Sequence, residues 1–223
     1  MTEAVTNRMT PVGAEGRTSE VYRAALMAVA GLVETRDPQA GDHLGRIQAY
    51  CRLMIEQLNG RGRTTALSDT VVAASILHDI GKAVIPDRIL LKPGRLTVRE
   101  FRYVRRHTSE GRRVISRIIR RLGPHPFLLA ARDIAYGHHE RWDGTGYPRG
   151  LAGDRIPLAA RVVAVADVFD ALVSRRCYKP PIPVREALQA IEDGARSHFD
   201  PDVVAAFHQS RDAIAEVAAG CPA

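Results

Sequence analysis

The feature that most constrains this chain is a pair of adjacent histidines, His138 and His139, followed at once by a turn-forming segment. Neighbouring side chains on a helix diverge by about 100°, so both imidazoles can face one ion only where the helix stops. Asp143, Gly144 and Gly146 supply that stop. Taken alone, the pair also fits a surface loop with two ordinary histidines. The choice therefore depends on the rest of the chain.

Helical periodicity runs through most of the sequence, whereas strand-length alternation, hairpin signals and internal repeats are not found. We therefore expect an all-α fold, with one helical bundle domain over residues 19–223. Residues 1–18 are polar and aperiodic, which favours a flexible leader or linker. The expected helices cover residues 19–34, 40–58, 68–77, 97–121, 127–136 and 158–173, a short segment from 184, and residues 201–218.

Composition narrows the class of protein and its partners. The formal net charge is +7, which favours an anionic partner such as a nucleotide, a nucleic acid or an acidic surface, without choosing among them. Cys51, Cys177 and Cys221 are widely spaced, which argues for a reducing compartment and against a disulfide scaffold. No signal peptide and no membrane-spanning apolar run are found. We expect a soluble, cytoplasmic protein.

Two of the expected helices carry carboxylates into apolar surroundings. The helix from residue 68 ends in His78 and Asp79, and Asp167 lies in the middle of the nearly all-apolar segment 158–173. A buried carboxylate is costly unless it is paired or bound to a metal. For Asp167, the alternative is a hydrogen bond to Arg161 or to a helix cap.

Two further histidines are expected to face inward. His43 lies one turn before the apolar Ile47, and His107 interrupts an arginine-rich helix whose other charges form a solvated face. Histidine and carboxylate ligands without thiolate suit iron, manganese or zinc, and this set is too large for one ion. We therefore predict two ions, with Asp79 bridging them. The candidate ligands are His43, His78, Asp79, His107, His138, His139 and Asp167.

These residues belong to an ordered series of motifs that closely resembles the HD-GYP domain, a branch of the HD phosphohydrolase superfamily. The resemblance covers roughly residues 20–210. Its motifs are His78-Asp79-Ile80-Gly81-Lys82, Ile85-Pro86-Asp87, Lys92-Pro93-Gly94, His107, the segment 138–148 with Gly146-Tyr147-Pro148, Ile156-Pro157, residues 166–172, Tyr178-Lys179 and Phe199-Asp200-Pro201.

The resemblance implies an HD-type helical bundle with a dinuclear metal site that hydrolyses the bacterial second messenger cyclic di-GMP to pGpG, GMP or both. The seven candidate ligands would hold the metals, and Asp79 would be central to catalysis. Lys82, one turn beyond His78, would hold an oxygen of the scissile phosphate. Arg161 and Lys179 would contact the phosphates or guanines of the ligand. Tyr147 would shape the loop beside the site.

The same resemblance bears on the number and kind of metal ions. A trinuclear subgroup carries a glutamate one turn before the histidine that matches His43, and Gln39 occupies that position here. An amide is a poor anionic bridge, so we expect two divalent ions, iron or manganese first, with zinc, magnesium, nickel and cobalt as alternatives.

Two other functions remain open at this level. One is a cyclic di-GMP receptor with little turnover, and the other is a phosphohydrolase that acts on another nucleotide. A nucleic acid polymer is not expected as a partner. The apolar helix over residues 21–33 is the expected surface for a homodimer or for a regulatory protein.

Overall fold

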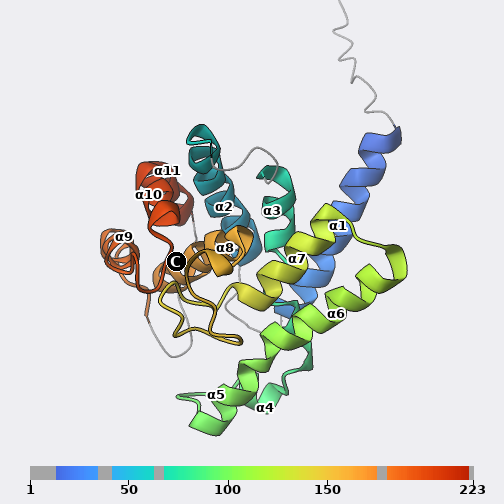
Figure 1. Cartoon of the computed structure of the whole chain (residues 1–223). Coiled ribbons are helices and arrows are strands. Elements are labelled where there is room, and N and C mark those ends of the chain that lie inside the picture. Colours follow the sequence, from blue (N-terminus) through green and yellow to red (C-terminus); the bar gives the residue numbers. More distant parts are fainter. Residues whose placement is uncertain (1–13, 35–41, 63–67, 175–179, 221–223) are drawn as a thin grey trace, which may run out of the picture.

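The computed structural model describes residues 14–34, 42–62, 68–174 and 180–220 (Figure 1). The all-α prediction is confirmed, because these residues form helices and contain no strand. The α-helices are α1 (Ala14–Glu34), α2 (His43–Gly60), α3 (Ser68–Ser75), α4 (Asp87–Leu90), α5 (Val98–Val104), α6 (Arg106–Leu122), α7 (Pro126–Gly137), α8 (Leu158–Val173), α9 (Val184–Asp193), α10 (Pro201–Gln209) and α11 (Arg211–Ala219). Two 3-10 helices are η1 (Ile80–Val84) and η2 (Gly153–Arg155).

The core lies where α2, α3, α7 and α8 pack together, with α10 and α11 against the other side of α2 (Figure 1). Its position explains why α8 is apolar on nearly all sides. Val163, Val165, Ala166 and Phe169 of α8 are fully buried. Burial of apolar surface stabilises the fold by about 25 cal/mol per Å². The packing of this central helix against α2 and α7 therefore holds in place the helices that bear the site residues.

Two helix starts that the sequence predicts are confirmed. The Thr97 hydroxyl accepts from the Glu100 amide, and the Glu100 carboxylate accepts from the Thr97 amide, which completes a capping box. Asp200 caps α10 by accepting from the Asp202 amide, with Pro201 in the first turn.

Two predicted helices are each interrupted by one residue. Arg105 separates α5 from α6, where His107 Nδ1 donates to the Val104 carbonyl at 2.8 Å and the Thr108 hydroxyl donates to the Arg105 carbonyl at 3.0 Å. Such local side-chain bonds compete with the helical ladder. Ser210 separates α10 from α11, and its hydroxyl donates to the Leu53 carbonyl of α2. The sequence pattern alone predicts continuous helices at both places.

The helix α1 begins at Ala14, within the leader that the sequence predicts, and residues 1–13 lie outside the described part of the chain. The boundary at residue 19 therefore stays a prediction. Among the described residues, no helix is long and apolar enough to cross a membrane. Cys51 is buried, and burial raises the pKa of its thiol to about 12. Cys177 and Cys221 lie outside the described residues.

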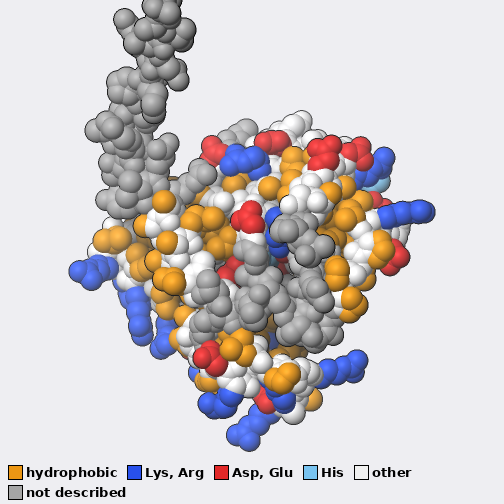
Figure 2. All heavy atoms as spheres, turned by 180° about the vertical axis from the view of Figure 1, so that it is seen from behind, with side chains coloured by type: hydrophobic (Ala, Val, Ile, Leu, Met, Phe, Trp, Pro, Cys, Tyr) orange, Lys and Arg blue, Asp and Glu red, His pale blue; other side chains and the backbone are white. Residues whose placement is uncertain are grey.

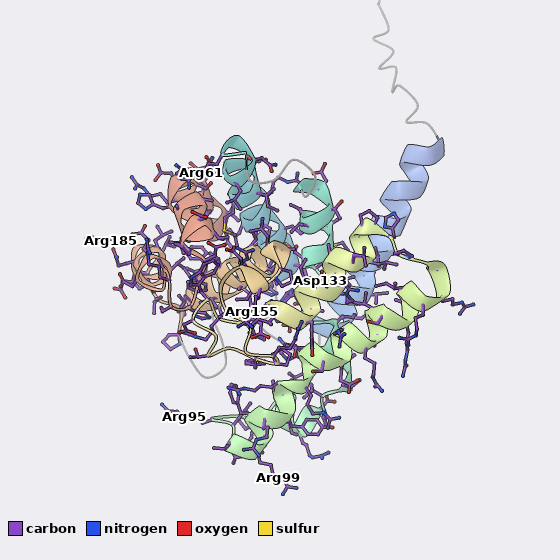
Figure 3. The ribbon with its side chains drawn as sticks, viewed as in Figure 1. Arg61, Arg95, Arg99, Asp133, Arg155 and Arg185 are labelled. Carbon is purple, nitrogen blue, oxygen red and sulfur yellow. The ribbon has the colours of Figure 1, made fainter. Side chains whose placement is uncertain are left out.

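Many basic side chains lie at the edge of the molecule. Figure 2 shows Lys and Arg side chains projecting along its lower edge, the region of α4, α5 and the start of α6. On α5, Arg99 points away from the protein body (Figure 3). These positions agree with the expected solvated face.

Candidate metal centre

Three of the predicted ligands lie at helix ends or interruptions. His78 follows the end of α3, His107 follows the break at Arg105, and His138 follows the end of α7. In each, Nδ1 lies at hydrogen-bond distance from a backbone carbonyl, that of Ser75 at 2.9 Å, Val104 at 2.8 Å and Ile134 at 3.0 Å. A carbonyl only accepts, so Nδ1 carries the proton and the Nε2 lone pair is left for a metal.

Their ligand atoms form two groups, in each of which all of the ligand atoms lie within 4.8 Å of one another. The Asp79 group consists of Asp79, His107, His138 and His139, and the Glu34 group consists of Glu34, His43 and His78. All of these residues except His139 are buried. The structure thus brings together six of the seven predicted ligands and adds Glu34.

Asp79 lies between the two groups. Its Oδ1 is 3.2 Å from His107 Nε2 and 3.7 Å from His138 Nε2, whereas its Oδ2 is 3.3 Å from His78 Nε2. Oδ2 is also 2.6 Å from Lys82 Nζ. One carboxylate oxygen therefore faces each group, as a bridging ligand requires.

The donor atoms fit a cation. His78 Nε2 and Asp79 Oδ1 are buried and make no hydrogen bond. His107 Nε2 and His138 Nε2 face each other at 3.4 Å, although both Nδ1 atoms already carry the ring proton. Lone pairs that converge in this way need a metal ion or an added proton between them. A set of imidazole and carboxylate ligands suits a divalent transition metal.

A buried side-chain network orients His43. Its Nδ1 lies 2.7 Å from Asp170 Oδ2, and Arg46 binds Asp170 through Nε at 2.6 Å and through Nη2 at 3.0 Å. Burial alone would raise the pKa of Asp170, but His43 and Arg46 outweigh it and hold that pKa below its usual value. The His43 Nε2 atom is then directed toward Glu34, 3.6 Å away.

Charge states differ between the groups in the metal-free protein. Burial lowers the pKa of His107, of His138 and of His139, the last to about 4. Burial also opposes protonation of His78, but Asp79 outweighs it and raises the pKa of His78 to about 9. Burial works against ionisation of Asp79 as well, yet Lys82 and His78 hold its pKa well below the usual range.

Glu34 is a candidate ligand that the sequence analysis missed. It ends α1, is 8% exposed, and burial raises the pKa of its carboxyl group. Glu34, nine positions before His43, lies 3.6 Å from His43 Nε2, and the two ions predicted from Gln39 stay a prediction. Gln39 itself lies outside the described residues. The available signal was a glutamate at the end of an apolar helix.

Three other residues were predicted for the site, namely Asp167, Arg161 and Lys179. Asp167 belongs to neither group, but His78, His139 and His43 outweigh its burial and lower the pKa of its carboxyl group, so it is electrostatically coupled to both. Arg161 donates to the Ile156 carbonyl, to Asp154 and to Asp200. Lys179 lies outside the described residues.

The loop after His139 is held by hydrogen bonds to a buried carboxylate. The buried carboxylate of Glu140 accepts from the amides of Arg149 at 2.8 Å and Leu151 at 3.0 Å. A Cβ on Gly146 would lie 2.5 Å from the Glu140 Cα, so only glycine fits this approach. The next residue, Tyr147, stacks on the His139 ring with centroids 4.8 Å apart.

Comparisons with known proteins agree with this architecture. The sequence model of the HD domain family matches residues 27–203. A protein of Vibrio cholerae named a probable cyclic di-GMP phosphodiesterase is 46% identical over 198 residues, which cover 86% of this chain and 45% of that protein. Another protein of that organism, named 3'3'-cGAMP-specific phosphodiesterase 2, is 36% identical over 203 residues, covering 91% of this chain and 37% of its own.

A solved structure supports the same fold. Bd1817 of Bdellovibrio bacteriovorus, described as an HDG"Y"P protein, matches with a TM-score of 0.54 at 18% identity, over 73% of this chain and 50% of its own. The chain belongs to the HD domain family, and its motifs are those of the HD-GYP branch. It spans less than half the length of the two curated relatives.

Proposed function

We propose that this chain is a metal-dependent phosphodiesterase that hydrolyses cyclic di-GMP to pGpG, GMP or both. The observation that carries the proposal is the pair of donor groups joined by Asp79, with Lys82 beside them. The name of the Vibrio cholerae relative at 46% identity supports the choice of substrate. The proposal keeps the cytoplasmic location expected from the cysteine usage.

The proposal includes two divalent ions, one for each donor group, with iron or manganese first and zinc, magnesium, nickel or cobalt as alternatives. Bound ions of this kind act as Lewis acids on a phosphoryl group and activate water for in-line displacement. The Asp79 group would hold one ion and the Glu34 group the other, with Asp79 shared. Asp167, coupled to both, would complete the ligand set.

The residues around the donor groups would position the substrate. Lys82 is 24% exposed in its side chain and pairs with Asp79, so its ammonium group lies at the wall of the site and would hold an oxygen of the scissile phosphate. Tyr147 would line the site above His139. Contacts of Lys179 and Arg161 with substrate remain part of the proposal, although Arg161 already donates to three protein groups.

A second candidate substrate is 3'3'-cGAMP. It is favoured by the relative at 36% identity whose name specifies that dinucleotide. The two substrates share the phosphodiester ring and differ in one base, so the metal centre cannot separate them.

The test is anaerobic reconstitution with iron or manganese, followed by incubation with cyclic di-GMP and, separately, 3'3'-cGAMP. Products are separated by chromatography, and the metal content is measured on the same sample. Metal-dependent conversion of cyclic di-GMP at about two ions per chain is expected. Faster conversion of 3'3'-cGAMP than of cyclic di-GMP would identify 3'3'-cGAMP as the substrate. Binding of cyclic di-GMP without conversion would indicate a receptor and not an enzyme.

A further inference from the structure

Tyr147 connects the metal centre to an exposed arginine. Its ring lies against the His139 imidazole, with an angle of 26° between the planes. The guanidinium carbon of Arg105 lies 4.5 Å from the centre of the same Tyr147 ring and 4.7 Å from that of Phe101. A continuous row of side chains thus leads from a metal ligand to Arg105, at the break between α5 and α6.

These ring contacts leave the hydrogen-bond donors of Arg105 available. A cation–π contact uses the positive charge, whereas the five N–H donors of a guanidinium lie in its plane. Within the described part of the chain, Arg105 has no carboxylate at ion-pair distance. Arg161 differs, because its side chain is 10% exposed and pairs with Asp154 and Asp200.

Contact with an aromatic ring is not itself unusual in this protein. Arg112 lies over the Tyr136 ring at 4.6 Å, and Arg106 lies over the Tyr103 ring at 4.9 Å. Neither tyrosine stacks on a ligand of the metal centre. Arg105 is set apart because its ring partner also touches His139.

We infer that Arg105 binds the second phosphate of the dinucleotide, the one that is not being cleaved. The inference rests on the proposed function, because a cyclic dinucleotide carries two phosphodiesters. The scissile phosphate belongs beside the donor groups, whereas Arg105 lies against the Tyr147 ring and is not among the donors. A planar guanidinium offers two parallel donors to phosphate oxygens. The Phe101 and Tyr147 rings would hold it in place for that contact.

The test compares two substrates that differ in the second phosphate. Cyclic di-GMP has it, and bis(p-nitrophenyl) phosphate is a single phosphodiester. Arg105→Ala, Arg105→Lys and the control Arg99→Ala are assayed in the metal-loaded protein. Arg99 is a suitable control because it is an exposed arginine of α5 that points away from the body (Figure 3).

A charged hydrogen bond of about 1.5–3 kcal/mol corresponds to about a 10- to 150-fold change. We expect Arg105→Ala to raise the KM for cyclic di-GMP by that factor, with little change in kcat and none in the KM for bis(p-nitrophenyl) phosphate. Arg105→Lys should recover part of the loss, and Arg99→Ala should match the unaltered protein.

Equal effects on both substrates, or an unchanged KM for cyclic di-GMP, would overturn the role of Arg105. If the unaltered protein leaves cyclic di-GMP intact, the proposed activity fails, and binding of cyclic di-GMP by titration calorimetry then tests Arg105 separately. A weaker Kd in Arg105→Ala than in Arg99→Ala supports the phosphate contact. An unchanged Kd, or no binding by the unaltered protein, overturns it.

Discussion

The two donor groups of the metal centre are built in different ways. In the Asp79 group, backbone carbonyls near helix ends orient His107 and His138. In the Glu34 group, a backbone carbonyl also orients His78, but His43 depends on the Asp170 and Arg46 side chains. The first arrangement needs only local backbone geometry, whereas the second needs a buried ion pair between α2 and α8. The Glu34 group should therefore be easier to disable by single substitutions.

Replacement of the shared ligand should have the largest effect. Asp79→Asn keeps the shape of the side chain but removes the anionic bridge, so both groups should lose metal. Even partners outside the ligand shell affect metal affinity or activity by about 10- to 100-fold, so we expect turnover to fall by more than about 100-fold. Metal analysis and product chromatography measure this, with the exposed Asp212→Asn as control. Normal metal content in Asp79→Asn would refute the shared role.

Loss of one group alone is expected from Glu34→Gln. The amide keeps the size of the side chain but cannot replace its charge, so metal content should fall from about two ions to about one per chain. The Asp79 group should stay loaded. The exposed Glu56→Gln on α2 is the matched control. A full complement of metal in Glu34→Gln would show that Glu34 is not a ligand.

The difference between the groups also explains what could be predicted from sequence. His78 and His138 follow helices whose apolar pattern is visible in the sequence, so their burial was predictable, whereas His107 was predicted as the exception on an arginine-rich helix. Glu34 reaches the site only through the packing of α1 beside η1, which periodicity does not reveal. Asp167 and Asp170 lie one turn apart in α8, and the pattern cannot tell which one interacts electrostatically with both donor groups and which one orients His43.

Asp170→Asn should act on the Glu34 group more strongly than on the Asp79 group. It weakens the anchor of His43, so metal affinity of the Glu34 group should fall by about 10- to 100-fold. It also breaks the buried ion pair between Asp170 and Arg46, and loss of one member of such a pair costs about 3–5 kcal/mol of unfolding free energy. Metal titration and urea unfolding measure both effects.

Ser174→Ala is the control for that substitution. Its hydroxyl contacts Asp170 at 3.2 Å and Arg46 at 3.0 Å, yet its loss leaves the carboxylate and its charge in place. Equal weakening of both groups by Asp170→Asn would contradict a specific link between Asp170 and His43.

The smallest expected effect is a difference in proton release on metal binding. At pH 7.5 the metal-free His78 is protonated, because its pKa is raised to about 9, whereas His107, His138 and His139 are neutral because theirs are lowered. An ion in the Glu34 group must therefore displace about one proton from His78, and its affinity should rise with pH up to about 9. Calorimetry in two buffers of different ionisation enthalpy counts the protons.

Glu34→Gln, which should load only the Asp79 group, is expected to release fewer protons than the unaltered protein. Equal release by both proteins would mean that His78 gives up its proton to the ion of the Asp79 group, and that the two groups act as one centre.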